Sequence, residues 1–255
     1  LRWSKSDCLR LLYPGSGLLC WDGLLEIKPD LPGVGGWRHQ YASPANQADS
    51  RDAVVGNAAG FRLQWFGGVG PSRMPDRHLR GPAPLAVGSA MIMQTDGGLI
   101  GVDPANGTER WSMELPPNTL RLVTPYDGGY SCLDENGQRL FIAAPKHVFG
   151  INSMDGEIIQ RIALPNDLLD QRWGYLAVGQ SRLVASVMKK TAPRVAADRG
   201  VQRAYVDQDY RSNRPLVCSR QMISMTTDGR VLWRYESQGP IPNGTISIDE
   251  KTNRI

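Results

Sequence analysis

The residues best suited to chemistry lie in one short stretch, RMPDRHLR, at positions 73 to 80. Asp76 and His78 are the types that form a general acid–base pair. Three guanidinium groups beside them can clamp an anion: Arg73, Arg77 and Arg80. A structural role is the simpler interpretation, in which Arg77 and His78 donate to backbone carbonyls and pair with Asp76. We therefore expect no catalytic residue in this chain.

A second group of charges lies in a long stretch that breaks the pattern of the surrounding sequence, residues 188 to 215. Its basic residues outnumber its acidic ones, and Arg199 is near its middle. Long inserted loops on a rigid scaffold often carry function, although a solvated surface loop is the simpler interpretation. If the chain binds a ligand, we expect an unknown protein or an anionic small molecule. The residues expected to contact it are Arg77, His78, Arg80 and Arg199.

The cysteines and histidines do not have the spacing of a metal site. Four cysteines stand far apart: Cys8, Cys20, Cys132 and Cys218. No Cys-x-x-Cys or His-x-x-x-His pair exists, and nucleophile-elbow, P-loop and His-Glu-x-x-His motifs are also missing from the sequence. We expect mostly buried thiols, no metal and no cofactor in this chain.

Composition favours a β-rich globular protein. The 255 residues are 41% hydrophobic and 21% charged, and the 28 glycines and 18 prolines are spread along the chain, as in many short strands joined by turns. The net charge of +4 is mild and no block of five like charges exists, so a nucleic-acid or membrane-surface role is not favoured. No apolar run is long enough to predict a membrane span.

The elements that must position these residues come from an internal repeat. Residues 89–116 align without a gap with residues 138–165, each predicting strand, turn, strand, turn with glycine, strand, and a final Leu-Pro. A third, longer copy runs through residues 181–186 and 222–236. Trp233 follows Gly229 by four residues, as Trp111 follows Gly107. Three further segments supply a fourth strand for each copy: 84–88, 129–135 and 174–179.

A four-stranded meander cannot bury both of its faces alone, so the repeats are expected to pack face to face as blades of a β-propeller. The predicted fold is all-β, with about three to four four-stranded antiparallel blades and an incomplete ring. Trp111 is expected to wedge between neighbouring blades. Asp103 is expected to accept backbone N–H bonds in the turn, and Gly107 to supply a positive φ.

The next copy of the repeat departs from this pattern. Asn152 stands where Asp103 does, Gly156 corresponds to Gly107, and Gln160 replaces the tryptophan. We expect a weaker interface on the side of this copy that carries Gln160.

The motif of Gly101, Asp103, Gly107 and Trp111 resembles the tryptophan-docking repeat of pyrroloquinoline-quinone-type (PQQ-like) propellers. Residues 36–88 are similar to the segment that leads into the first blade in the large PQQ-like propeller proteins of planctomycete-type bacteria. Trp65 corresponds to the tryptophan of that first blade. The resemblance covers residues 36–255 and implies a periplasmic or cell-envelope location. Its alternative function is a PQQ- and calcium-dependent oxidoreductase, but the adjacent cysteines of such enzymes are not in this sequence.

Two segments point beyond this chain. Residues 1–32 are expected to be the remnant of an upstream domain and to form the end of a helix, a Pro-Gly turn and a strand. They are similar to the end of a class I methyltransferase domain, so an accessory role to a methyltransferase is a second alternative. We expect residues 33–255 to form the propeller, and residues 246–255 to break off where the first hairpin of a further blade should begin. The remaining blades are expected from C-terminal sequence. The favoured function is a non-catalytic binding or scaffolding module.

Overall fold

A computed structural model describes most of the chain. The described residues are 3–15, 17–57, 59, 62–67, 73, 82–95, 97–116, 119, 129–188 and 218–255. These residues form three four-stranded antiparallel sheets and one two-stranded hairpin. In each four-stranded sheet the strands neighbour one another in sequence order, as expected for a simple up-and-down meander.

The three sheets follow the predicted repeats. The first contains β3 (Leu85–Val87), β4 (Ala90–Gln94), β5 (Gly98–Val102) and β6 (Glu109–Glu114). The second contains β7 (Ser131–Leu133), β8 (Arg139–Ala143), β9 (His147–Asn152) and β10 (Ile158–Ala163), followed by the 3-10 turn η2 (Asn166–Leu168). The third contains β11 (Arg172–Gly179), β12 (Arg182–Met188), β13 (Cys218–Thr226) and β14 (Val231–Pro242), followed by η3 (Asn243–Thr245).

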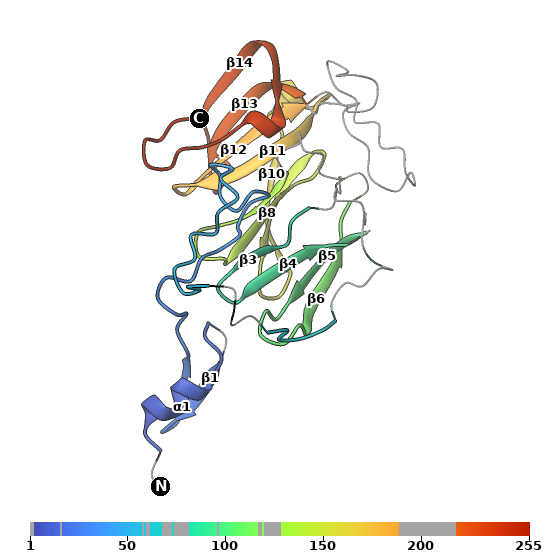
Figure 1. The fold of residues 1–255 in the computed structure, drawn as a ribbon. Helices are drawn as coiled ribbons and strands as arrows, with labels where there is room; N and C mark the ends of the chain where they lie inside the picture. Colours follow the sequence, from blue (N-terminus) through green and yellow to red (C-terminus); the bar gives the residue numbers. More distant parts are fainter. Residues whose placement is uncertain are drawn as a thin grey trace.

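The sheets pack on one another in the order of the sequence (Figure 1). The first strand β7 contacts both β3 and β11, and one buried cluster draws apolar side chains from all three sheets. Its largest members include Tyr130, Phe141 and Trp173, which are almost fully buried. Face-to-face packing of meanders around adjacent first strands is the architecture of propeller blades. The predicted all-β, partial β-propeller fold is therefore confirmed.

Residues 36–50, which we name the entry segment, contact the first strand of each sheet in turn. Trp37 exchanges two backbone hydrogen bonds with Ala86 of β3, at 2.7 and 2.8 Å. The next residue, Arg38, accepts a backbone bond at 2.9 Å from Leu133 of β7. These bonds connect the chain before the first sheet to the inner strands of two sheets, so the entry segment ties the blades together.

Residues 3–15 and 17–30 form a small unit that projects from the sheets (Figure 1). Helix α1 (Lys5–Leu11) begins with a capping box between Ser4 and Asp7. A hairpin follows, formed by β1 (Leu18–Trp21) and β2 (Leu24–Ile27). The predicted helix and turn are confirmed, but the single expected strand is a hairpin. Its turn residues Asp22 and Gly23 both have positive φ, 51° and 78°, as a two-residue hairpin turn requires.

The described helices are short: none has the length and apolar character needed to cross a bilayer.

Candidate functional site

The residues predicted to contact a ligand cannot be placed in the fold. Arg77, His78, Arg80 and Arg199 lie outside the described residues, as do Asp76 and nearly all of the insertion. Arg73 is described, and its guanidinium forms an exposed ion pair with Glu109 at 3.1 Å. The anion-binding and acid–base interpretations of this cluster therefore remain predictions.

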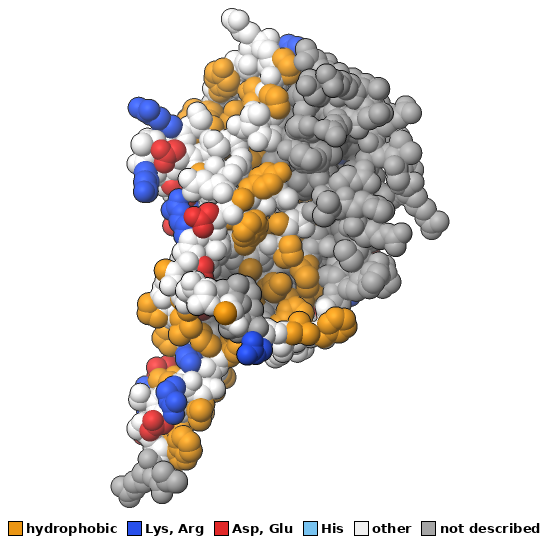
Figure 2. Space-filling view, viewed as in Figure 1, with side chains coloured by type: hydrophobic (Ala, Val, Ile, Leu, Met, Phe, Trp, Pro, Cys, Tyr) orange, Lys and Arg blue, Asp and Glu red, His pale blue; other side chains and the backbone are white. Residues whose placement is uncertain are grey.

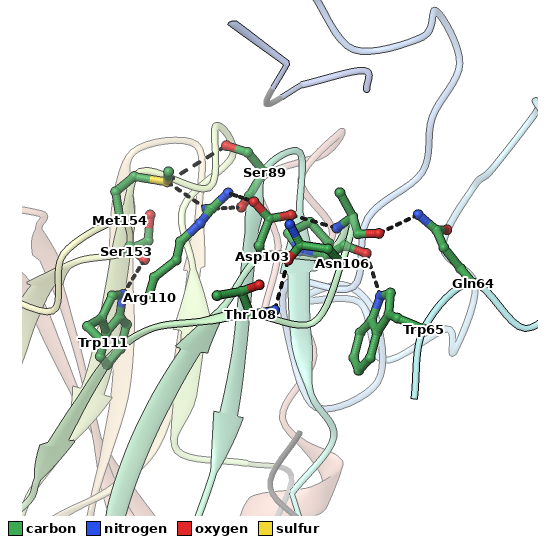
Figure 3. A network of polar contacts seen from close by, with 12 residues as sticks. Gln64, Trp65, Ser89, Asp103, Asn106, Thr108, Arg110, Trp111, Ser153 and Met154 are labelled. Carbon is green, nitrogen blue, oxygen red and sulfur yellow. Dashed lines mark hydrogen bonds and ion pairs between the residues drawn. The ribbon is translucent and has the colours of Figure 1, made fainter. Parts of the chain in front are cut away.

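The tryptophan of the first sheet joins that sheet to the second (Figure 3). Trp111 lies on β6, and its indole N–H donates to the carbonyl oxygen of Ser153 at 2.9 Å. Ser153 is in the turn between β9 and β10, three residues before Gly156. A Cβ on Gly156 would come within 2.7 Å of the indole ring, and this glycine has a φ of 78°. The contact therefore needs both the small size and the backbone freedom of glycine.

Trp65 makes the same contact with the first sheet. Its indole N–H donates to the carbonyl oxygen of Pro104 at 2.9 Å, and Pro104 lies three residues before Gly107. A Cβ on Gly107 would be 2.4 Å from the ring, and Gly107 has the predicted positive φ, 73°. In both places the acceptor is the carbonyl three residues before the turn glycine, so the two junctions share one geometry.

Asp103 and Asn152 stabilise the two turns against which Trp65 and Trp111 pack. Asp103 accepts the backbone N–H of Ala105 at 2.7 Å, which is the predicted Asx-type bond. Its other carboxylate oxygen pairs with Arg110 at 2.8 Å. Asn152 accepts the backbone N–H of Met154 at 3.0 Å. The aspartate and the asparagine therefore fulfil the same role in the turn, but only the aspartate adds an ion pair.

The junction between the second and third sheets uses a residue that the sequence pattern did not identify. The sequence predicts Gln160 at the tryptophan position, but the side chain packed on the turn glycine Gly229 is Ile162. A Cβ on Gly229 would be 3.0 Å from two carbons of Ile162. Alternation along β10 places residues 160 and 162 on the same face. That period-two relationship was the signal that could have revealed Ile162.

Trp233 lies on β14 at the position equivalent to Trp111, but this residue is 37% exposed, whereas Trp111 is 8% exposed. It lines a groove of about 680 Å³ on the outer face of the third sheet. Tyr235, Met222 and Ile241 line the same groove, together with residues from Thr245 to Ile255. Figure 2 shows hydrophobic side chains at this end of the molecule. Most of the surface exposed in the groove is apolar.

Residues 246–255 form the other wall of the groove. Ile246 and Ile248 are buried against Tyr175 and Val184 of the third sheet. Asp249 and Arg254 form an isolated antiparallel bridge, with backbone bonds of 2.9 and 3.3 Å. The segment is thus a short hairpin, which we name the C-terminal hairpin.

The entry segment also binds the C-terminal hairpin. Ile248 donates its backbone N–H to Pro44 at 2.8 Å, and Asn46 donates its side-chain amide to the Ile246 carbonyl at 2.7 Å. One nitrogen of Arg38 contacts both carboxylate oxygens of Glu250, at 2.8 and 2.7 Å. The entry segment therefore contacts this hairpin as it contacts the inner strands of the sheets.

The buried titratable groups are used in packing. His39 accepts the backbone N–H of Val178, in β11, at 3.1 Å through Nε2. Burial lowers the pKa of His39 well below its usual range, and the charge of Arg38 lowers it further. Burial also raises the pKa of the Cys132 thiol. His39 is therefore neutral at physiological pH and acts as an acceptor that links the entry segment to the third sheet.

The prediction of mostly buried thiols is wrong in part. Cys132 is buried, but Cys8 is half-buried and Cys20 is exposed. Cys20 and Leu18 share the more exposed face of β1. Within the described part of the chain, no group of three or more His, Cys, Asp or Glu side chains is arranged to hold a metal ion.

The sheets and their junctions define a β-propeller type of protein. No protein-family model matches the chain, and no curated protein matches it in sequence. Among solved structures it is similar to BamB from Moraxella catarrhalis, with 15% identity, a TM-score of 0.32 and 61% of this chain covered. It is also similar to a protein of unknown function from Bacteroides caccae, with 12% identity, a TM-score of 0.29 and 59% covered. The match spans only 48% of the BamB chain and 59% of the Bacteroides chain.

Proposed function

We propose that the chain is a non-catalytic β-propeller module that binds a protein partner. The observation that carries this proposal is the apolar groove on the outer face of the third sheet. Trp233 and Tyr235 are 37% and 54% exposed in and beside it. Exposed aromatic residues grouped on one face are typical of protein interfaces, where they supply large buried areas at small entropic cost.

The shape of the apolar surface favours a protein over a small molecule. The groove runs across three strands, because Val184 of β12, Met222 of β13 and Tyr235 of β14 all line it. An open strand face of this kind offers a wide contact area, whereas a small ligand is usually bound in a more enclosed pocket. The anionic ligand predicted for Arg77, His78, Arg80 and Arg199 stays a separate prediction.

The binding role is tested by removing the two aromatic side chains. An affinity-tagged chain and its Trp233→Ser/Tyr235→Ser variant would be incubated with an extract of the source cells. Proteins captured in stoichiometric amount would be identified by mass spectrometry. Phe66→Ser is the matched control, because Phe66 is 95% exposed and lies outside the groove. We expect capture by the wild type and by the control, and loss of capture with the double variant. Equal capture by all three would contradict the proposal.

The non-catalytic role is tested by adding pyrroloquinoline quinone and calcium to the folded chain. We expect no stoichiometric quinone absorbance after gel filtration and no dye-linked alcohol oxidation. A bound quinone with alcohol oxidation would instead support the PQQ- and calcium-dependent oxidoreductase. The methyltransferase accessory role is separate, and a complete glycine-rich strand–loop–helix in sequence upstream of this chain would support it.

A further inference from the structure

We propose that the groove accepts a β-hairpin of this chain's own repeat type, which completes a fourth sheet together with the C-terminal hairpin. This inference rests on the proposed function, because it identifies the occupant of the same groove. This hairpin is a pair of antiparallel strands joined by a turn, and no other side chain packs on the glycine of that turn.

The first support is a second copy of a known hairpin in the sequence. Residues 249–255, DEKTNRI, resemble residues 134–140, DENGQRL, which join β7 to β8. The two segments also form the same backbone hydrogen bond. Asp134 donates its N–H to the carbonyl of Arg139 at 2.9 Å, and Asp249 donates its N–H to the carbonyl of Arg254 at 2.9 Å. The C-terminal hairpin is therefore the counterpart of the β7–β8 connection, at which a sheet of this repeat begins.

The second support is the position of this hairpin in the fold. The entry segment binds Ala86 of β3, Leu133 of β7 and Val178 of β11, and then binds Ile248. Ile246 and Ile248 thus take the place of a fourth inner strand. They cover the inner part of the third sheet, at Tyr175 and Val184, whereas Trp233 and Tyr235 on the outer strand β14 remain exposed. The outer part of the groove has the position of the two outer strands of a fourth sheet.

The third support is the exposed indole itself. Trp65 and Trp111 each cover a turn glycine and donate to the carbonyl three residues before it. Trp233 has the same spacing from its own turn glycine as Trp111. An occupant with a turn glycine would give the Trp233 indole the same contact. This chemistry specifies the occupant more narrowly than apolar character alone.

A second copy of this chain does not fit as the occupant, because the turn glycines of its described sheets are already covered. Gly107 is covered by Trp65, Gly156 by Trp111 and Gly229 by Ile162. Docking of a second copy on Trp233 would require one of these contacts to open. The hairpin must therefore come from a sheet whose turn glycine is uncovered.

The test supplies such a hairpin to the full chain. Because Ile255 corresponds to Leu140, residues 141–165 would be appended after Ile255, so that the second strand, the third strand, the glycine turn and the fourth strand follow in register. Hydrogen exchange of the β14 amides and acrylamide quenching of Trp233, assigned with Trp233→Phe, would be measured. We expect at least a tenfold slower exchange in β14 and reduced quenching.

The matched control carries alanine at the appended copy of Gly156, which places a Cβ against the indole. We expect this control to lose most of the protection. A second extension made from residues 92–116 provides the same turn chemistry from the first sheet. If neither extension protects β14 or Trp233, the inference is overturned. That result leaves the proposed function intact as long as capture of a partner still depends on Trp233 and Tyr235, so the two failures are distinguishable.

Discussion

The indole ring of Trp111 lies against Gly156 of the neighbouring sheet, where a Cβ would come within 2.7 Å of the ring. The same indole also donates a hydrogen bond to that turn, at Ser153. A tryptophan on an outer strand therefore makes both an apolar and a polar contact with the next blade. Because Trp65 repeats this arrangement, changes at either member of such a pair should affect how the sheets hold together.

Replacing the turn glycine should destabilise the junction. Gly156→Ala forces a positive φ on alanine and pushes a methyl group into the Trp111 ring, so we expect unfolding free energy to fall by about 3 kcal/mol. Urea unfolding followed by circular dichroism measures this loss. Gly23→Ala is the control, because Gly23 has the same φ of 78° with no atom within 4 Å. Its cost, read from hydrogen exchange in β1 and β2, should be only about 1 kcal/mol.

Removing the indole N–H together with the five-membered part of the ring should also be costly. Trp111→Phe keeps an aromatic ring but leaves the buried Ser153 carbonyl without this donor, so we expect a loss of about 1–3 kcal/mol in unfolding free energy. Trp233→Phe, at the exposed equivalent position, should change it by about 0.5 kcal/mol or less. Both variants would be measured by thermal and urea unfolding. Equal losses of unfolding free energy for Trp111→Phe and Trp233→Phe would show that the Trp111 hydrogen bond contributes nothing to the junction.

His39 should make stability depend on pH. Its folded pKa is lowered well below 6.5 by burial and by Arg38, so the unfolded chain binds the proton more readily. Stability is therefore fully present above pH 6.5 and is lost as pH falls below it, by up to about 1.4 kcal/mol per pH unit for this one group. His39→Gln keeps an acceptor and does not titrate, so the slope between pH 6.5 and 5 should be smaller. An unchanged slope in urea unfolding would assign the effect to other groups.

The ion pair between Arg38 and Glu250 should hold the C-terminal hairpin on the entry segment. The side chains are only 16% and 26% exposed, so Glu250→Gln should cost about 2 kcal/mol through a weakened pair. Faster hydrogen exchange at residues 246–250 is the expected local result. Glu26→Gln disrupts the more exposed pair with Lys5 and should cost about 0.5 kcal/mol. Unchanged exchange at 246–250 would contradict a role for this pair.

The sequence alone determined the blades and their turns. Period-two alternation and turn glycines are local properties, so the four-stranded meanders, the Asp103 turn and the positive φ of Gly107 could be predicted residue by residue. The second strand of the N-terminal hairpin was missed although Asp22 and Gly23 are a typical hairpin turn. That error was one of interpretation, because the local signal was present.

Only the tertiary structure decided which residues meet across the sheets. The path of the entry segment past β3, β7 and β11, the acceptor role of His39 and the pairing of Arg38 with Glu250 all join residues far apart in sequence. Packing on Gly229 likewise depends on which side chain of β10 reaches it, and Ile162 does so instead of Gln160. Local patterns specify the conformation of each strand and turn, whereas contacts between distant segments depend on the packed three-dimensional arrangement, which no local pattern encodes.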